Sequence, residues 1–174
     1  MCASLAGPQD DVRAASADLR PEVETAPLVL IAEDNEINAL LARRVVERAH
    51  CEAVVVGTGQ GAIDAVTQTF TPGSRRFDLV LMDVFMPGVD GIEATRAIRA
   101  LFAGQRHGAP PIIALTANAF AEDRQRCLAA GMSDYLAKPF DVYDLDRLLA
   151  RWVGGTDTTR SAINAAAPNA SPAA

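Results

Sequence analysis

One stretch of the sequence decides the fold: FDLVLMDVFMPGVDGIEATRAIR, residues 77–99. It contains a short continuous apolar run, Leu79–Met82, of the kind found in strands that are covered on both faces. Apolar residues then recur at helical spacing over 94–101. Asp90 stands at the start of this helix and Glu93 comes three residues after Asp90, a pair like that of a capping box. The stretch therefore predicts a strand followed by a helix.

The same alternation of strand and helix extends over the rest of the chain. Further apolar runs lie at residues 28–32, 53–56, 112–115 and, more weakly, 135–137. Helical patterns fill the gaps, and a last helix covers 142–152 behind a predicted cap at Asp141. Five such units in about 127 residues predict an α/β fold. The expected form is a flavodoxin-like three-layer sandwich with a parallel five-stranded sheet of order 2-1-3-4-5.

The predicted helices differ in how well their apolar faces are defined. One face of the first helix is apolar and consists of Ile37, Leu40, Leu41 and Val45. We expect such a face to turn toward the core. The fourth helix, within 121–130, has only Cys127 and Leu128 as clear apolar anchors. It should therefore be the most weakly held of the five.

The composition favours a globular domain in a reducing compartment. Of the 174 residues, 49% are hydrophobic and 22% are charged, which is ordinary for a globular chain, and the net charge is −6. This acidic balance argues against a broad nucleic-acid or anionic-membrane surface. Cys2, Cys51 and Cys127 are scattered and fit neither a disulfide framework nor a zinc site. A cytoplasmic location follows as the expectation.

The two ends of the chain read differently from its centre. Residues 1–26 are rich in Ala, Asp, Pro and Ser, and residues 154–174 are small and polar. Neither segment has enough apolar surface to offset the entropy of ordering. We therefore expect a disordered arm or linker over 1–26, a folded domain over 27–153 and a disordered tail over 154–174.

Polar side chains follow four of the five predicted strands. Glu33 and Asp34 follow the first strand, Asp83 the third, Thr116 the fourth and Lys138 the fifth. The carboxyl ends of parallel strands meet at one edge of the sheet, where ligands bind in such folds. Each residue alone could be a helix cap or a surface charge, but the joint pattern indicates one site.

The residue types in this cluster suit phosphoryl transfer. Three neighbouring carboxylates repel one another and require a proton or a cation, and Mg²⁺, with Mn²⁺ as the alternative ion, prefers such oxygen ligands. An ammonium and a hydroxyl can bind the oxygens of an anionic group. An aspartate can act as the nucleophile and form an aspartyl phosphate.

Four longer segments carry a family resemblance. They are LVLIAEDNEIN (28–38), FDLVLMDVFMPGVDGIEATRAIR (77–99), PIIALTANAF (111–120) and CLAAGMSDYLAKPF (127–140). Over 27–153 the chain resembles the receiver domain of response regulators. The sequences of its motifs are most similar to those of receivers of hybrid sensor histidine kinases. The resemblance implies a phosphoacceptor in a two-component phosphorelay rather than an enzyme acting on a separate substrate.

The resemblance also assigns roles around the acidic cluster. It implies that Asp83 is phosphorylated, that Asp34 is a direct metal ligand and that Glu33 acts largely through water. Phe85 stands at the position whose backbone carbonyl completes the metal site. Lys138 pairs with the phosphoryl oxygens.

Further roles concern the switch between two conformations. The resemblance implies that Thr116 follows the phosphoryl group and that Tyr135 changes rotamer with it. Ala117 is the small residue that admits the phosphoryl group, and the peptide bond before Pro139 is commonly cis in this family. The readout would be the surface formed by 121–130, Tyr135 and 141–152, which is also the face expected for self-association.

Two residues are expected to modulate the lifetime of the phosphorylated form. Phe85 lies two residues past Asp83, and Asn118 lies two past Thr116. Both flank the expected path of a hydrolytic water. Because the Phe85 side chain is bulky and apolar, we expect slow autodephosphorylation.

The expected partner is a histidine kinase or a histidine phosphotransfer protein, with no nucleic acid and no direct membrane contact. His50 and His107 do not suit a phosphorylated histidine within this chain. A haloacid-dehalogenase-type phosphohydrolase is disfavoured, because it needs an acid where Phe85 stands. A pseudo-receiver that only binds proteins is the remaining alternative. Both a stand-alone regulator and the cytosolic part of a hybrid kinase fit the sequence.

Overall fold

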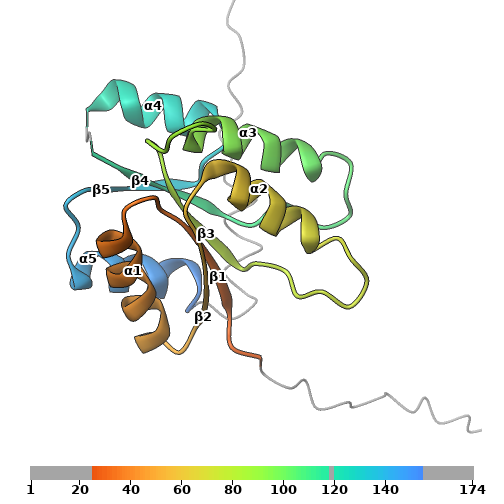
Figure 1. The fold of residues 1–174 in the computed structure, drawn as a ribbon, viewed down its shortest axis with the longest axis horizontal. Coiled ribbons are helices and arrows are strands. Elements are labelled where there is room, and N and C mark those ends of the chain that lie inside the picture. The colour runs from red at the N-terminus through yellow and green to blue at the C-terminus, as the bar shows by residue number, and fades with distance from the viewer. Residues whose placement is uncertain (1–24, 118–119, 155–174) are drawn as a thin grey trace, which may run out of the picture.

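The computed structural model describes residues 25–117 and 120–154. Along the chain the elements are β1 (Leu28–Ala32), α1 (Glu36–Arg48), β2 (Glu52–Val56), α2 (Gly59–Gln68), β3 (Leu79–Asp83), α3 (Gly91–Leu101), β4 (Ile112–Thr116), α4 (Ala121–Ala129), β5 (Asp134–Ala137) and α5 (Val142–Trp152). The strands form one parallel sheet of order β2-β1-β3-β4-β5, which confirms the predicted fold (Figure 1). The expected disorder at the two ends concerns segments that lie almost wholly outside the described residues.

The helices cover both faces of the sheet, so the core is divided into two layers. Alternate strand residues such as Leu30 and Val80 pack against α2, α3 and α4. The intervening residues, such as Ile31 and Leu81, pack against α1 and α5. β3 and β4 are buried along their whole length because both of their faces are covered. Their apolar runs position the polar residues that follow at the carboxyl edge.

Side-chain caps fix where four of the five helices begin. Asn35 accepts hydrogen bonds from the first turn of α1, Thr58 caps α2 and Asp90 caps α3. Asp141 caps α5 in a reciprocal box with Asp144. These bonds satisfy backbone N–H groups that have no partner within the helix. The remaining helix, α4, begins without a side-chain cap.

The predicted buried face of α1 is wrong in its first two turns. Ile37 is 79% exposed and Leu40 is 56% exposed. The buried residues of α1 are Ala39, Ala42, Val45 and Val46. The small alanine side chains allow the helix to lie close to the sheet, so the face containing them turns inward. In α4, Leu128 is likewise 43% exposed, and Cys127 alone is buried.

None of the described helices is both long enough and apolar enough to cross a membrane.

Candidate functional site

Three carboxylates meet at the carboxyl edge of the sheet. Glu33 and Asp34 follow β1, and Asp83 is the last residue of the neighbouring strand β3. One oxygen of each carboxylate lies within 4.8 Å of the others. Glu33 and Asp83 are buried, whereas Asp34 is exposed. The cluster is therefore a recessed acidic site that opens to solvent at Asp34.

Lys138 brings a positive charge into this cluster. Its ammonium donates a hydrogen bond to Asp83 Oδ2 at 2.7 Å and lies 2.6 Å from Glu33 Oε2. Burial lowers the pKa of Lys138, but the bonds and charges of Asp83 and Glu33 outweigh burial and raise the pKa overall. The side chain is therefore an ammonium at neutral pH. The Lys138–Pro139 peptide bond is cis.

Both oxygens of Asp83 are held in place. Oδ2 accepts from Lys138, and Oδ1 accepts from the backbone N–H of Phe85 at 3.1 Å. With both oxygens bonded, the carboxylate is fixed at the end of β3. Such fixation suits a nucleophile that must attack in a defined direction.

The donor set fits a hard divalent cation. Glu33 Oε1 accepts from Asn38 Nδ2 at 3.0 Å, and Glu33 Oε2 is paired with the ammonium of Lys138 at 2.6 Å. Three carboxylates and one ammonium leave two negative charges unbalanced in the cluster. A bound Mg²⁺ would neutralise this excess charge, and carboxylate oxygens are the ligands that it prefers.

Thr116 and Tyr135 lie on the same face of the sheet. Thr116 is the last residue of β4, is 2% exposed and is paired with Ala137 in the register of β4 and β5. Tyr135 is paired with Ala114, two positions away from that pair. Because side chains alternate along a strand, Ala114, Thr116 and Tyr135 point to the side covered by α4.

The flanking residues are exposed. Ala117 directly follows β4 and is exposed, and the Phe85 side chain is 53% exposed beside the acidic cluster. Asn118 lies outside the described residues. The backbone N–H of Phe85 bonds Asp83 Oδ1, so this residue borders the acidic cluster.

The receiver-domain resemblance is borne out by comparison with known proteins. A family model described as the response regulator receiver domain matches residues 29–150. This chain belongs to the receiver-domain family. Sensor protein GacS of Pseudomonas syringae pv. syringae is 43% identical over 143 residues, which is 82% of this chain and 15% of that sensor protein. The receiver domain thus spans a small part of the sensor protein that it matches.

Solved receiver structures share the fold. The receiver domain of sensor histidine kinase PA1611 from Pseudomonas aeruginosa PAO1, which has a magnesium ion in its active site cleft, is 40% identical with a TM-score of 0.63, over 75% of this chain and 100% of that one. The receiver domain of Ssk1 from Saccharomyces cerevisiae, crystallised with the histidine phosphotransfer protein Ypd1, is 28% identical with a TM-score of 0.65, over 73% of this chain and 88% of that one.

Two supporting residues of this receiver domain were missed by sequence reasoning. Asn38 binds Glu33 from the first turn of α1, and Gly91 begins α3. A Cβ atom at Gly91 would lie 2.0 Å from the backbone oxygen of Asp83, so only glycine fits there. Both residues lie inside the quoted family segments, but nothing local in the sequence indicates what they contact.

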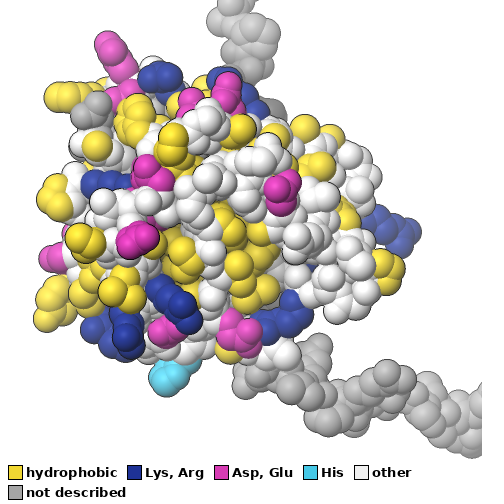
Figure 2. Space-filling view, viewed as in Figure 1, with side chains coloured by type: hydrophobic (Ala, Val, Ile, Leu, Met, Phe, Trp, Pro, Cys, Tyr) yellow, Lys and Arg dark blue, Asp and Glu magenta, His cyan; other side chains and the backbone are white. Residues whose placement is uncertain are grey.

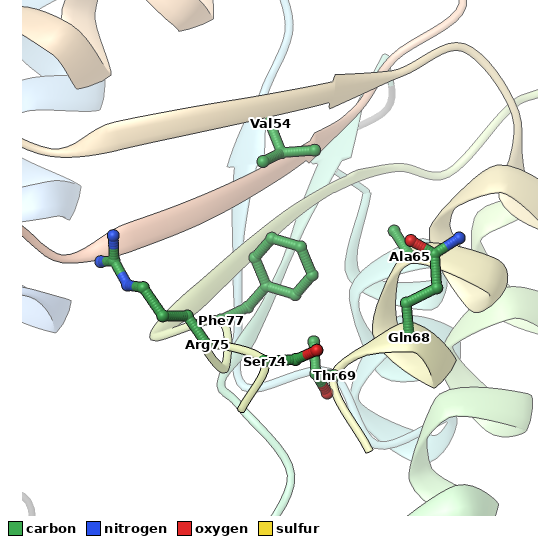
Figure 3. A pocket seen from close by; sticks show the side chains of 7 residues that line it. All are labelled: Val54, Ala65, Gln68, Thr69, Ser74, Arg75 and Phe77. Atoms are coloured by element: carbon green, nitrogen blue, oxygen red, sulfur yellow. The ribbon is translucent and has the colours of Figure 1, made fainter. Parts of the chain in front are cut away.

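A separate hollow lies away from the carboxyl edge of the receiver domain. It has a volume of about 220 Å³ and is formed by the β2 edge, the end of α2 and the segment before β3 (Figure 3). Val54, Ala65 and Phe77 form its apolar wall, and Arg75 lies at one side. None of the residues that line it is acidic. It therefore has no part in the acidic site.

Proposed function

We propose that this receiver domain accepts a phosphoryl group on Asp83 from a phosphohistidine of a partner protein, in the presence of Mg²⁺. The observation that carries the proposal is the fixed carboxylate of Asp83, bonded to Lys138 and to the N–H of Phe85, beside two further carboxylates. In the transfer, an oxygen of Asp83 forms a bond to phosphorus. The bond from phosphorus to the histidine nitrogen breaks, and its electron pair returns to the imidazole.

The residues of the site would have two roles in this transfer, binding the metal ion and pairing with the phosphoryl group. Asp34, Asp83 and the backbone carbonyl of Phe85 would hold the metal ion, with Glu33 acting largely through water. Bound Mg²⁺ would neutralise charge on the phosphoryl oxygens. Lys138 already lies against Asp83 Oδ2, so its ammonium would pair with the same phosphoryl group. The receiver structure that has magnesium in its active site cleft supports this assignment.

The response would begin at Thr116 and Tyr135. Phosphorylation adds charge and strong acceptor oxygens at Asp83, and the buried hydroxyl of Thr116 lies at the end of the adjacent strand. We propose that Thr116 moves toward these oxygens and that Tyr135 moves toward Thr116. The surface of α4, β5 and α5 then changes shape.

The rim of the site suits a closely fitting protein partner. Asp83 is only 4% exposed, so a histidine must be pressed deep into the carboxyl edge to reach it. Exposed apolar side chains are available nearby on α1, after β3 and at the starts of α4 and α5: Ile37, Leu40, Phe85, Phe120 and Tyr143. Hydrophobic side chains gather along the left edge in Figure 2, where α1, α4 and α5 begin. Clusters of this kind mark protein interaction sites.

This surface supports a histidine kinase or a histidine phosphotransfer protein as the partner. The Ssk1 receiver, similar in fold, forms a complex with such a phosphotransfer protein. We further propose a cytosolic setting within a hybrid sensor kinase. Cys51 and Cys127 are buried free thiols, which agrees with a reducing compartment, and the match to a much longer sensor protein agrees with the hybrid origin.

The proposal is tested by incubating the protein with Mg²⁺ and acetyl phosphate and measuring its intact mass. We expect a gain of about 80 Da that requires Mg²⁺ and is absent in Asp83→Asn. Asp64→Asn, an acid-to-amide change on α2 outside the cluster, is the matched control and should gain the same mass. If Asp83→Asn gains the mass as wild type does, Asp83 is not the acceptor.

The exposed Phe85 side chain leads to a proposal about lifetime. We propose that it hinders the hydrolytic water and slows the loss of the phosphoryl group. Phe85→Asn should speed that loss, because an amide can orient water, whereas Phe85→Leu should not. The decay of the phosphorylated mass with time measures both rates, and an unchanged or slower decay in Phe85→Asn would reject the idea.

A further inference from the structure

Arg124 on α4 makes a contact that none of the proposed roles includes. Its guanidinium carbon lies 5.1 Å from the centre of the Tyr135 ring, within the range of a cation–π interaction. Among the described residues Arg124 has no acidic partner, whereas Arg126 on the same helix pairs with Asp123. The charge of Arg124 is therefore directed at the ring of Tyr135 rather than at a carboxylate.

The contact of Arg124 with Tyr135 occurs together with a direct hydrogen bond from Lys138 to Asp83 Oδ2. Tyr135 is half-buried and packs at the margin of the core layer that includes Ala114 and Cys127. In this arrangement the ring lies beneath Arg124 rather than fully within the core. A contact present in only one of two states favours that state by its own free energy.

The two ends of α4 are held to different extents. Beyond the carboxyl end of α4, the backbone oxygen of Gly131 and Ser133 Oγ accept hydrogen bonds from Arg99 of α3, at 2.8 Å and 3.3 Å. Arg99 also donates to the backbone oxygen of Pro110, just before β4, at 3.1 Å. These bonds tie the turn after α4 to α3 and to the start of β4. At its amino end the helix has no side-chain cap. Arg124, one turn into the helix, thus belongs to the part that is less well held.

We propose that Arg124 is a latch that holds Tyr135 in its unphosphorylated position, so that the contact between them sets how readily the receiver switches. This inference rests on the proposed function, because it assumes that Tyr135 moves toward Thr116 when Asp83 is occupied. When the ring moves, it leaves the guanidinium, and the less tightly held start of α4 is released. The latch opposes switching, and its removal favours the switched state.

The test uses beryllofluoride with Mg²⁺ as a stable mimic of the phosphoryl group, and the half-saturating concentration is followed by fluorine NMR. Arg124→Met keeps helix propensity and the aliphatic stem but removes the charge. We expect it to bind beryllofluoride about two- to five-fold more tightly than wild type, the range that an exposed cation–π contact gives. Arg124→Lys should lie between the two. Arg126→Met, the same change at another exposed arginine of this helix, should match wild type.

A second variant, Tyr135→Leu, shows whether Arg124 affects beryllofluoride affinity through the Tyr135 ring. In Tyr135→Leu, adding Arg124→Met should change the affinity no further. Three results would overturn the latch and leave the phosphoacceptor proposal intact. Arg124→Met could bind beryllofluoride with the same affinity as Arg126→Met, or more weakly than wild type. Arg124→Met could also raise the affinity by the same factor in the Tyr135→Leu background. If wild type binds no beryllofluoride, the proposed function fails and the latch fails with it.

Discussion

Helices α4 and α5 flank β5, yet they are held in the molecule very differently. α5 begins with a reciprocal capping box at Asp141 and buries three leucines, whereas α4 has no side-chain cap and buries only Cys127. Burial of large apolar side chains supplies most of the stabilisation of a helix in a protein. The difference assigns the two helices separate tasks: α5 fixes the edge of the sheet, and α4 is free to respond to the site.

The largest expected difference between the two helices is in core stability. Leu149→Ala in α5 should lower the free energy of unfolding by about 2–5 kcal/mol, because it empties a fully buried position. Leu128→Ala in α4 is the matched change at a position that is 43% exposed, and it should cost less than about 1 kcal/mol. Urea denaturation measures both values. Equal losses would remove the distinction between the helices.

A second comparison uses two buried thiols as reporters of local opening. Burial raises the pKa of Cys127, and Asp123 adds to that rise; burial also raises the pKa of Cys51. Both thiols are therefore protonated at neutral pH and react only when the structure opens. We expect iodoacetamide to modify Cys127 on the order of tenfold faster than Cys51, because α4 opens more readily.

This alkylation is followed by peptide mass analysis in a Cys2→Ser background, so that only the two buried thiols remain. Exposure alone does not predict faster alkylation of Cys127, because Cys127 is 2% exposed and Cys51 is 7% exposed. A faster reaction at Cys51 would mean that α4 is not the more weakly held helix.

The smallest expected effects concern the helix caps. Asp141→Ala should lower the free energy of unfolding by about 1 kcal/mol, because it removes the cap of α5. Phe120→Asp should raise it by about 0.5–1 kcal/mol, because it gives α4 the cap that it lacks. Thermal unfolding at low ionic strength detects both. If Phe120→Asp destabilises the protein, the start of α4 depends on the phenylalanine side chain rather than on capping.

The weak hold on α4 could be predicted from the sequence, since only Cys127 and Leu128 interrupt its polar pattern. The positions of Asp83 and Lys138 could be predicted as well, because short apolar runs end at one edge of a parallel sheet. Which apolar residue faces inward was less predictable. Leu128 and Ile37 are exposed because alanine or cysteine on a neighbouring face packs against the sheet instead.

The long-range contacts made by arginine side chains on the helices could not be predicted. Arg99 binds Gly131 and Ser133, which lie more than 30 residues further along the chain, and its burial lowers its pKa without any acidic partner among the described residues. Arg124 reaches Tyr135 only because α4 lies over β5. No periodicity or local motif specifies such pairs, because they depend on the angle at which a helix packs on the sheet.

Hydrogen exchange with and without beryllofluoride and Mg²⁺ tests most directly whether occupancy of Asp83 is transmitted to α4. The peptides to compare span residues 121–130 and 142–152, with Asp83→Asn as the control protein. We predict that exchange changes most in 121–130 of wild type, that it changes less in 142–152, and that neither peptide changes in Asp83→Asn. Equal changes in both peptides, no change in 121–130, or the same change in Asp83→Asn would contradict the account.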